Sequence, residues 1–307
     1  MAAIFNIILP VFLLIALGYA AMRFSLFTRE QIDGIGRFIM VVGMPSLVFN
    51  ALATRPLAEV VNPVYLAGYG IGSAVSFAVM QRLCLRCGQP PVLSVLNGLA
   101  AGMANSGFIG YPVLMMAIGS AAGGFFAMNV LVESIVILPV MFVLIEIYRG
   151  GGGNWAVLLR RIGLGLLKNP IVPALLASLL VALTGMPLPA VLAKTVATLA
   201  SATAPLALFV IGASLFGLTV RGNMKDLLLG SMGKMVLMLV SVVFFLWLFG
   251  ADRDTLYAGA LLACAPTPSI YALFGRQYGY GEQTAGVMLL TTVVSAVPFF
   301  AVLWLWR

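Results

Sequence analysis

The sequence predicts an all-α integral membrane protein with ten transmembrane helices, arranged as two inverted five-helix repeats in which the fourth and ninth spans are broken and cross. Three observations support this fold class. Hydrophobic residues make up 62% of the 307 residues and charged residues only 8%, with a mean hydropathy of +1.11, whereas soluble domains are about 25% charged. Uncharged runs of bilayer-spanning length recur along the chain. Prolines also recur at matched positions in its two halves.

The composition excludes several classes of function. Ten crossings of about 22 residues use about 220 residues, so only short loops remain and no soluble catalytic domain fits. The net charge of +8 is interpreted as loop orientation rather than a nucleic-acid surface. The chain has no histidine and three cysteines, and the pair Cys84 and Cys87 offers two ligands where a structural zinc needs four. We therefore expect no metal site, no cofactor and no nucleic-acid partner.

The uncharged runs define the spans. The run from Cys87 to Val132 is too long for one helix, and the glycine-rich stretch from Gly119 to Gly124 divides it. The resulting spans lie near residues 2–22, 36–54, 62–82, 92–118, 125–147, 168–185, 188–217, 226–249, 254–275 and 283–306. The first repeat then covers residues 1–148, a cytoplasmic linker residues 149–167, and the second repeat residues 168–307.

Basic residues near span ends predict the orientation, because they are retained on the cytoplasmic side. Twelve fall on the side of the first loop and four on the other side. Both termini are therefore expected outside the cytoplasm, in a multi-pass protein of the bacterial inner (plasma) membrane. The twelve are Arg23, Arg29, Arg37, Arg82, Arg86, Arg149, Arg160, Arg161, Lys168, Arg221, Lys225 and Arg276; the four are Arg55, Lys194, Arg253 and Arg307.

Proline-containing features of the first half recur in the second half at offsets of 159 to 163 residues. Because each half has an odd number of spans, the second copy enters the membrane in the opposite direction, as in many secondary transporters. A coincidence among prolines is the alternative. The matched features are Asn6 to Pro10 with Asn169 to Pro173, Pro45 with Pro205, and Pro139 with Pro298.

Spans 4 and 9 are the least regular. Span 4 carries the segment from Asn105 to Pro112, and span 9 the segment from Ala263 to Ser269, each with proline and small or hydroxyl residues. Proline removes a backbone donor and clashes with the preceding turn, so each helix should break there and expose polar backbone groups at bilayer depth. Two breaks at matching positions indicate a binding site. A proline kink without a ligand is the alternative.

These segments resemble the auxin efflux carrier family, which includes the plant PIN carriers and bacterial proteins proposed to move small organic acids such as malate and malonate. The likeness covers nearly the whole chain. It is carried by Asn105 to Val113 in span 4, Ala265 to Thr267 in span 9, Gly43 to Phe49 in span 2, Pro205 to Gly212 in span 7 and Lys168 to Pro170 in span 6.

The resemblance implies an NhaA-like, bile-acid-transporter-like arrangement of two inverted repeats. Spans 1, 2, 6 and 7 would form a scaffold, which makes a homodimer contact in plant members, and spans 3–5 and 8–10 a transport unit with elevator-like alternating access. The chain departs from the plant pattern in its short linker, in the absence of an acidic residue from span 3, and in Glu133 and Thr267, where plant members have glutamine.

The site residues follow from the chemistry of a broken helix, whose free N–H groups and dipole favour an anion. Neutral donors orient a carboxylate at a lower desolvation cost than a buried cation. Glu133, the only acid deep inside a span, is the candidate for proton coupling; a neutral, hydrogen-bonded packing role is the alternative. Lys234 is the candidate for attracting the anion, with snorkelling as the alternative. The substrate-binding candidates are Asn105, Ser106, Gly107, Pro112, Asn129, Pro266, Thr267, Pro268 and Ser269.

We therefore expect a secondary transporter of a small organic anion, a carboxylate such as an auxin-like acid, malate or malonate, and not an enzyme. A sodium-coupled symporter of the bile-acid type remains an alternative, because hydroxyl and amide oxygens lie at both breaks. A membrane sensor without transport is the second alternative. An intramembrane enzyme would need a nucleophile or base at depth, and the chain offers no histidine and one buried acid there.

Overall fold

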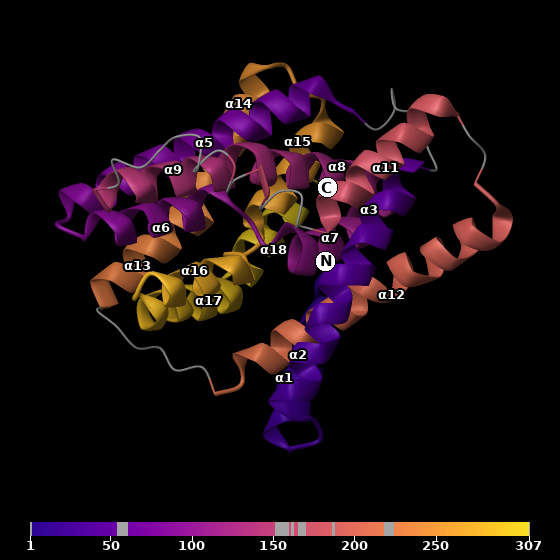
Figure 1. Cartoon of the computed structure of the whole chain (residues 1–307), viewed down its shortest axis with the longest axis horizontal. Coiled ribbons are helices and arrows are strands. Elements are labelled where there is room, and N and C mark those ends of the chain that lie inside the picture. Colours follow the sequence, from indigo (N-terminus) through magenta and orange to yellow (C-terminus); the bar gives the residue numbers. More distant parts are fainter. Residues whose placement is uncertain are drawn as a thin grey trace. The chain divides into compact units, whose positions relative to one another are not determined.

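A computed structural model describes residues 2–53, 61–150, 160, 163–164, 170–185, 188–217 and 224–306. Within these residues the regular structure is entirely helical, as Figure 1 shows, and contains no strand. Most of the predicted linker 149–167 lies outside the described residues, as do Lys168 and Asn169 of the span 6 motif. The all-helical part of the fold prediction is thereby confirmed for the described chain.

The chain divides into two compact units, which are described separately below. Unit 1 comprises Met1–Asn62, Gly107–Met128 and Gly165–Gly217, and unit 2 comprises Pro63–Ser106, Asn129–Leu164 and Leu218–Arg307. The predicted spans 1, 2, 6 and 7 fall in unit 1, together with the second half of span 4 and the start of span 5. The predicted spans 3, 8, 9 and 10 fall in unit 2.

Unit 1 is organised around the close packing of its first helix against a later one. Gly18 and Gly212 let these two backbones touch: a Cβ atom on Gly18 would lie 1.9 Å from the Phe209 carbonyl oxygen, and one on Gly212 would lie 1.8 Å from that of Ile15. Only glycine fits at either point. The elements are α1 (Ala2–Arg23), α2 (Arg29–Phe38), η1 (Ile39–Gly43), α3 (Met44–Ala53), α7 (Tyr111–Ile118), η3 (Gly119–Ala121), α8 (Ala122–Val132), α11 (Ile171–Thr184) and α12 (Ala190–Leu215).

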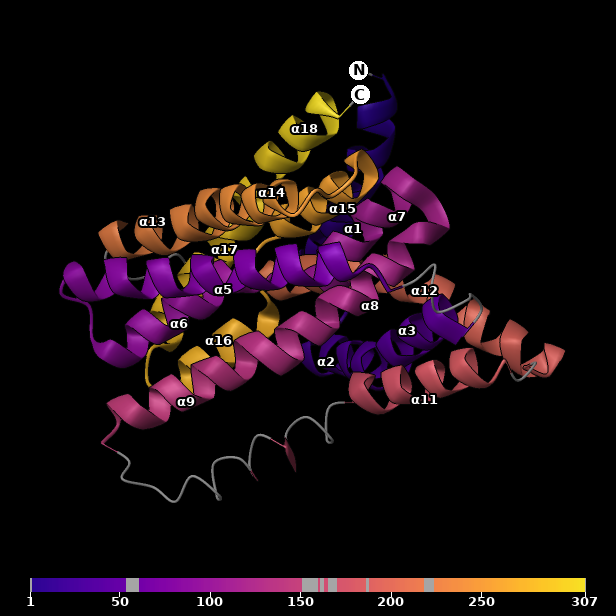
Figure 2. The ribbon, with the colours of Figure 1, turned by 90° about the horizontal axis from the view of Figure 1, so that it is seen from above.

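Unit 2 contains the helices that position the candidate site. Its long helices α5 and α14 lie side by side (Figure 2), and Gly72 allows their close approach, because a Cβ atom there would lie 2.7 Å from the Val242 Cα. The elements are α5 (Pro63–Arg86), α6 (Pro91–Gly102), the start of η2 (Ser106–Gly110), the end of α8, η4 (Glu133–Ile137), α9 (Leu138–Tyr148), α13 (Met224–Met232), η5 (Gly233–Leu237), α14 (Met238–Leu248), α15 (Arg253–Cys264), α16 (Ser269–Gln277), α17 (Gly281–Val294) and α18 (Ala296–Leu305).

Four of these elements are π-helical turns, η1, η2, η4 and η5. A π-turn has one more residue per hydrogen-bonded ring than an α-turn and is frequently found at functional sites. Ser106 and Glu133 are the first residues of η2 and η4, and Lys234 is the second residue of η5. Three candidate site residues therefore lie in π-turns, where the helix is locally widened.

Six helices among the described residues are long and apolar enough to cross a membrane, or seven if the bent pair α15 and α16 counts as one span. They are Arg29–Ala53, Pro63–Arg86, Pro91–Tyr148, Ala190–Leu215, Met224–Leu248 and Gly281–Leu305. Two shorter apolar helices, Leu9–Arg23 and Ile171–Thr184, accompany them. A multi-pass membrane protein is thereby confirmed, whereas the ten-span inverted repeat stays a prediction.

Candidate functional site

Span 4 is interrupted between α6 and η2. α6 ends at Gly102, Met103 has an extended backbone with φ −133° and ψ 142°, and helical geometry resumes at Ser106. Pro112 is not the point of interruption, because the helix continues through it from η2 (Ser106–Gly110) into α7 (Tyr111–Ile118). The break therefore lies at residues 103–105, at the beginning of the predicted motif rather than at its proline.

The backbone groups freed by this break find partners elsewhere in unit 2. In a continuous α-helix the N–H groups of Ala104 and Asn105 would bond to carbonyls four residues earlier. The Ala104 N–H instead donates to Glu133 Oε1 at 3.2 Å. The Asn105 N–H donates to the Pro266 carbonyl oxygen at 2.7 Å. The second of these bonds joins the break in span 4 directly to the break in span 9.

Span 9 is interrupted between α15 and α16, which are bent by 41° relative to one another. Ala265 has an extended backbone with φ −62° and ψ 143°, and Pro266 has no N–H. In a continuous helix the Thr267 N–H would bond to the Ala263 carbonyl. It instead reaches Thr291 Oγ1 at 3.4 Å, and the two threonine hydroxyl oxygens lie 3.1 Å apart. The Ala263 carbonyl consequently loses its helical donor.

The Glu133 carboxyl group supports the first break and is only 4% exposed. Besides the Ala104 N–H, it accepts hydrogen bonds from Ser106 Oγ at 3.1 Å and Asn129 Nδ2 at 3.0 Å. Asn129 in turn accepts from the Tyr65 hydroxyl at 3.5 Å. Both amide donors bond to Oε1, and the Ser106 hydroxyl at Oε2 can donate or accept, so these contacts fit an ionised and a protonated carboxyl alike.

Lys234 supports the second break and has no exposed surface. Its Nζ donates to the Ala263 carbonyl oxygen at 3.3 Å and to Met238 Sδ at 2.6 Å. The ammonium therefore ends inside unit 2, so the snorkelling interpretation is wrong. In the described part of the chain it forms no direct ion pair with Glu133.

The remaining predicted site residues are divided between the two units. Asn105 is buried, with 5% of its surface exposed, and Thr267 has none. Pro268 is the N-cap of α16, and Ser269 is the exposed first residue of that helix. Gly107, in η2, and Pro112, in α7, belong to unit 1. All the other candidates belong to unit 2.

Three residues that support the breaks were not predicted. Ser76 Oγ donates to the freed Ala101 carbonyl at 2.8 Å, and Tyr65 and Thr291 complete the contacts described above. A signal was available for α5, because Tyr65, Tyr69, Ser73 and Ser76 recur at spacings of three and four on one helical face. All four are fully buried.

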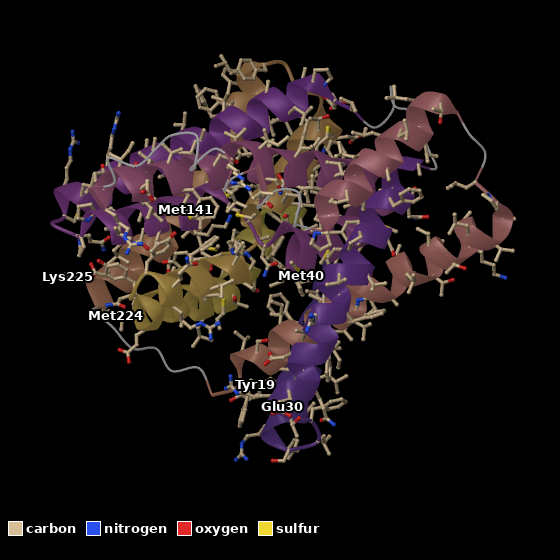
Figure 3. All side chains as sticks on the ribbon, in the orientation of Figure 1. Tyr19, Glu30, Met40, Met141, Met224 and Lys225 are labelled. Carbon is tan, nitrogen blue, oxygen red and sulfur yellow. The ribbon has the colours of Figure 1, made fainter. Side chains whose placement is uncertain are left out.

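A second buried network anchors α16 and was also not predicted. The Tyr271 hydroxyl donates to Asn97 Oδ1 at 2.8 Å, Asn97 Nδ2 donates to Gln89 Oε1 at 2.8 Å, and Gln89 Nε2 donates to Asp226 Oδ1 at 2.7 Å. This chain links α16 to α6 and to the start of α13, where Figure 3 labels Met224 and Lys225. The second half of the broken span 9 is thereby fixed within unit 2.

Apolar helices of membrane-spanning length, two of them interrupted at buried polar contacts, are typical of membrane transporters. The comparisons agree: the family model described as "Membrane transport protein" matches residues 3–304. The chain thus belongs to this family, the auxin efflux carrier family. A transporter rather than an enzyme is thereby confirmed.

Two relatives have transporter names. The chain is 26% identical to the "Putative malonate transporter" of Rhizobium meliloti, over 100% of this chain and 97% of that protein. It is 30% identical to an "Uncharacterized transporter" of Methanothermobacter thermautotrophicus, over 37% of this chain and 38% of that protein. The first similarity extends over the full length, and the second covers one segment.

Proposed function

We propose that the protein is a secondary transporter of a small organic anion, a carboxylate such as malonate, malate or an auxin-like acid. The observation that carries this proposal is the junction of the two helix breaks through the Asn105 N–H and the Pro266 carbonyl, 2.7 Å apart. A carrier needs a polar site that binds weakly and can be reorganised, and interrupted helices at membrane depth provide one. The full-length similarity to a protein named as a malonate transporter supports a carboxylate substrate.

The carboxylate would bind at the start of α16. Ser269 contributes an exposed hydroxyl there, and the first-turn N–H groups and the helix dipole favour negative charge. The Lys234 ammonium has three hydrogens and two partners in the described part of the chain, so its charge also attracts an anion. Asn105, Ser106, Asn129 and the residues Pro266 to Pro268 would shape the site within unit 2.

The ten-span inverted repeat remains our proposed topology. Pro91–Tyr148 is 58 residues long, more than twice the roughly 20 residues that one crossing needs, and Gly119 interrupts it with a positive φ of 66°. Counting this helix twice, the bent pair once and the two shorter apolar helices gives ten spans. The charge distribution then places both termini outside the cytoplasm, in a bacterial inner membrane.

Elevator-like alternating access would assign the two units different roles. Unit 1 would be the scaffold, able to form a homodimer, and unit 2 would carry the substrate through the membrane. Unit 2 is suited to moving as one body because hydrogen bonds join α5, α6, α15, α16 and α17 around the breaks.

The energy source depends on the direction of transport. A monoanion leaving a cell with a negative interior gains about 2.3 kcal/mol per 100 mV, so efflux needs no coupled ion. Concentrative uptake needs one, and Glu133 is the candidate for a coupled proton.

Thermal-shift measurements with malonate, malate and an indole carboxylate, followed by counterflow of the best ligand in proteoliposomes, test the proposal. Ser269→Ala should weaken binding about ten- to a hundredfold, because a hydrogen bond to a charged group contributes about 1.5–3 kcal/mol. Ser201→Ala, which removes an exposed hydroxyl from α12 in unit 1, should leave affinity unchanged. The proposal fails if no carboxylate shifts the melting temperature and none exchanges.

A further inference from the structure

The Ala263 carbonyl oxygen lies next to the break between α15 and α16. It lies in the last turn of α15, where the helix dipole concentrates negative charge. Its ordinary donor, the Thr267 N–H, is engaged by Thr291 Oγ1. The only charged donor that reaches the carbonyl in the described part of the chain is Lys234 Nζ, at 3.3 Å. The Lys234 amino group therefore lies at the C-terminal end of a broken half-helix.

In secondary transporters with broken helices, unwound carbonyls and half-helix C-termini are where coupling cations bind. A lysine ammonium carries the same single charge as an alkali cation but cannot leave. Met238 Sδ, a weak hydrogen-bond acceptor, is the second partner of Lys234 Nζ at 2.6 Å. The buried acid Glu133 lies at the other break, where it accepts from the Ala104 N–H.

We propose that Lys234 is a built-in cation that takes the place of a coupled sodium ion at the C-terminal end of α15. The wild-type protein then works without Na⁺, and a smaller neutral residue at position 234 opens a site for an alkali cation at the Ala263 carbonyl. The consequence for transport rests on the function proposed above, whereas the consequence for cation binding does not.

The experiment compares Lys234→Ser with wild type in NaCl and in choline chloride at equal ionic strength. Serine leaves room for a hydrated ion, whereas Lys234→Met fills similar space without charge, and Lys194→Ser removes an exposed lysine from α12. The first readout is the melting temperature of purified protein, which bound ligand raises by mass action. The second is malonate counterflow in proteoliposomes.

We expect Na⁺ to raise the melting temperature of Lys234→Ser saturably and to leave wild type, Lys234→Met and Lys194→Ser unchanged. Counterflow by Lys234→Ser should be about tenfold faster in Na⁺ than in choline, a difference of about 1.4 kcal/mol. Wild type should transport equally in both salts. A Lys234→Ser protein that is stable only in NaCl would support the proposal as well.

Three results overturn the inference: wild type that needs Na⁺ for stability or transport, folded Lys234→Ser that ignores Na⁺, or Lys234→Ser that unfolds equally in both salts. The melting-temperature readout needs no transport. A protein that moves no carboxylate but gains Na⁺ binding in Lys234→Ser would therefore refute the proposed function and leave the inference standing.

Discussion

Glu133→Gln is the substitution that separates the charge of this residue from its packing. The glutamine carbonyl can accept from the Ala104 N–H and the Asn129 amide, which now bond to Glu133 Oε1. Its amide nitrogen can donate to Ser106 Oγ, because a hydroxyl that now donates can turn and accept. All three contacts are thereby kept while the ability to ionise is lost.

The expected effect on stability follows from these contacts. A hydrogen bond to a charged group contributes about 1.5–3 kcal/mol and a neutral one about 0.5–1.5 kcal/mol, so Glu133→Gln should cost about 1–2 kcal/mol per bond. The loss is offset because a charge is no longer buried. Glu133→Ala instead leaves three donors without an acceptor, at about 1–3 kcal/mol each. The glutamine variant should therefore fold, and the alanine variant should melt at a much lower temperature.

The assay is substrate movement in proteoliposomes with an imposed pH gradient. If Glu133 binds and releases a proton during uptake, Glu133→Gln should still exchange substrate between the two sides but lose the pH-driven component. Glu146→Gln is the matched control, because Glu146 is a partly exposed acid in α9.

An equal response of wild type and Glu133→Gln to the pH gradient would refute the coupling hypothesis and make Glu133 a packing group. If wild type itself shows no response to pH, the membrane potential alone would drive the anion outward.

Four further changes have expected outcomes. Asn105→Ala should raise the KM for substrate with little loss of expression, because the backbone bond to Pro266 is kept; an unchanged KM would make the amide structural. Pro266→Ala restores a backbone donor, so transport should fall more than the amount of protein in the membrane, and equal losses would contradict this. Tyr271→Phe leaves its buried amide partner in α6 without a donor, which costs about 1–3 kcal/mol and should lower the melting temperature. Hydrogen bonds from the hydroxyl and N–H of Thr255 hold the pKa of Asp252 below its usual range. This helix cap therefore stabilises the protein above the ordinary pKa of about 3.9, and its contribution is lost as the pH falls further. Asp252→Ala should flatten that acid-side loss of stability, and an unaltered pH profile would contradict it.

The sequence indicated that span 4 is interrupted, but it did not indicate at which residues. Proline and small polar residues between Asn105 and Pro112 correctly indicated an irregular span 4. The interruption nevertheless lies at residues 103–105, because it depends on the Pro266 carbonyl and the Glu133 carboxyl. These partners are distant in sequence, and no local pattern encodes a bond between them.

The two intramembrane charges were predictable because an acid and a lysine are conspicuous in apolar helices. Their partners were not, because Glu133 and Lys234 bond partly to the main-chain groups of Ala104 and Ala263. Every residue has such groups, so sequence cannot show which ones a break has freed. The buried chain from Tyr271 through Asn97 and Gln89 to Asp226 was not predicted for a related reason, since its members come from three regions that are distant in sequence.

The π-turn η5, which contains Lys234, determines how the buried faces of α13 and α14 are rotated relative to one another. Between α13 and α14 the chain carries a widened turn at Gly233–Leu237, equivalent to one residue more than a regular helix would use. Deleting one residue here would rotate the face of α13 that buries Leu227 and Gly230 by about 100° relative to the face of α14 that buries Met238 and Val242. Both faces could not then remain packed. A single-residue deletion in this segment should therefore destabilise the protein, even at an apolar position that tolerates substitution.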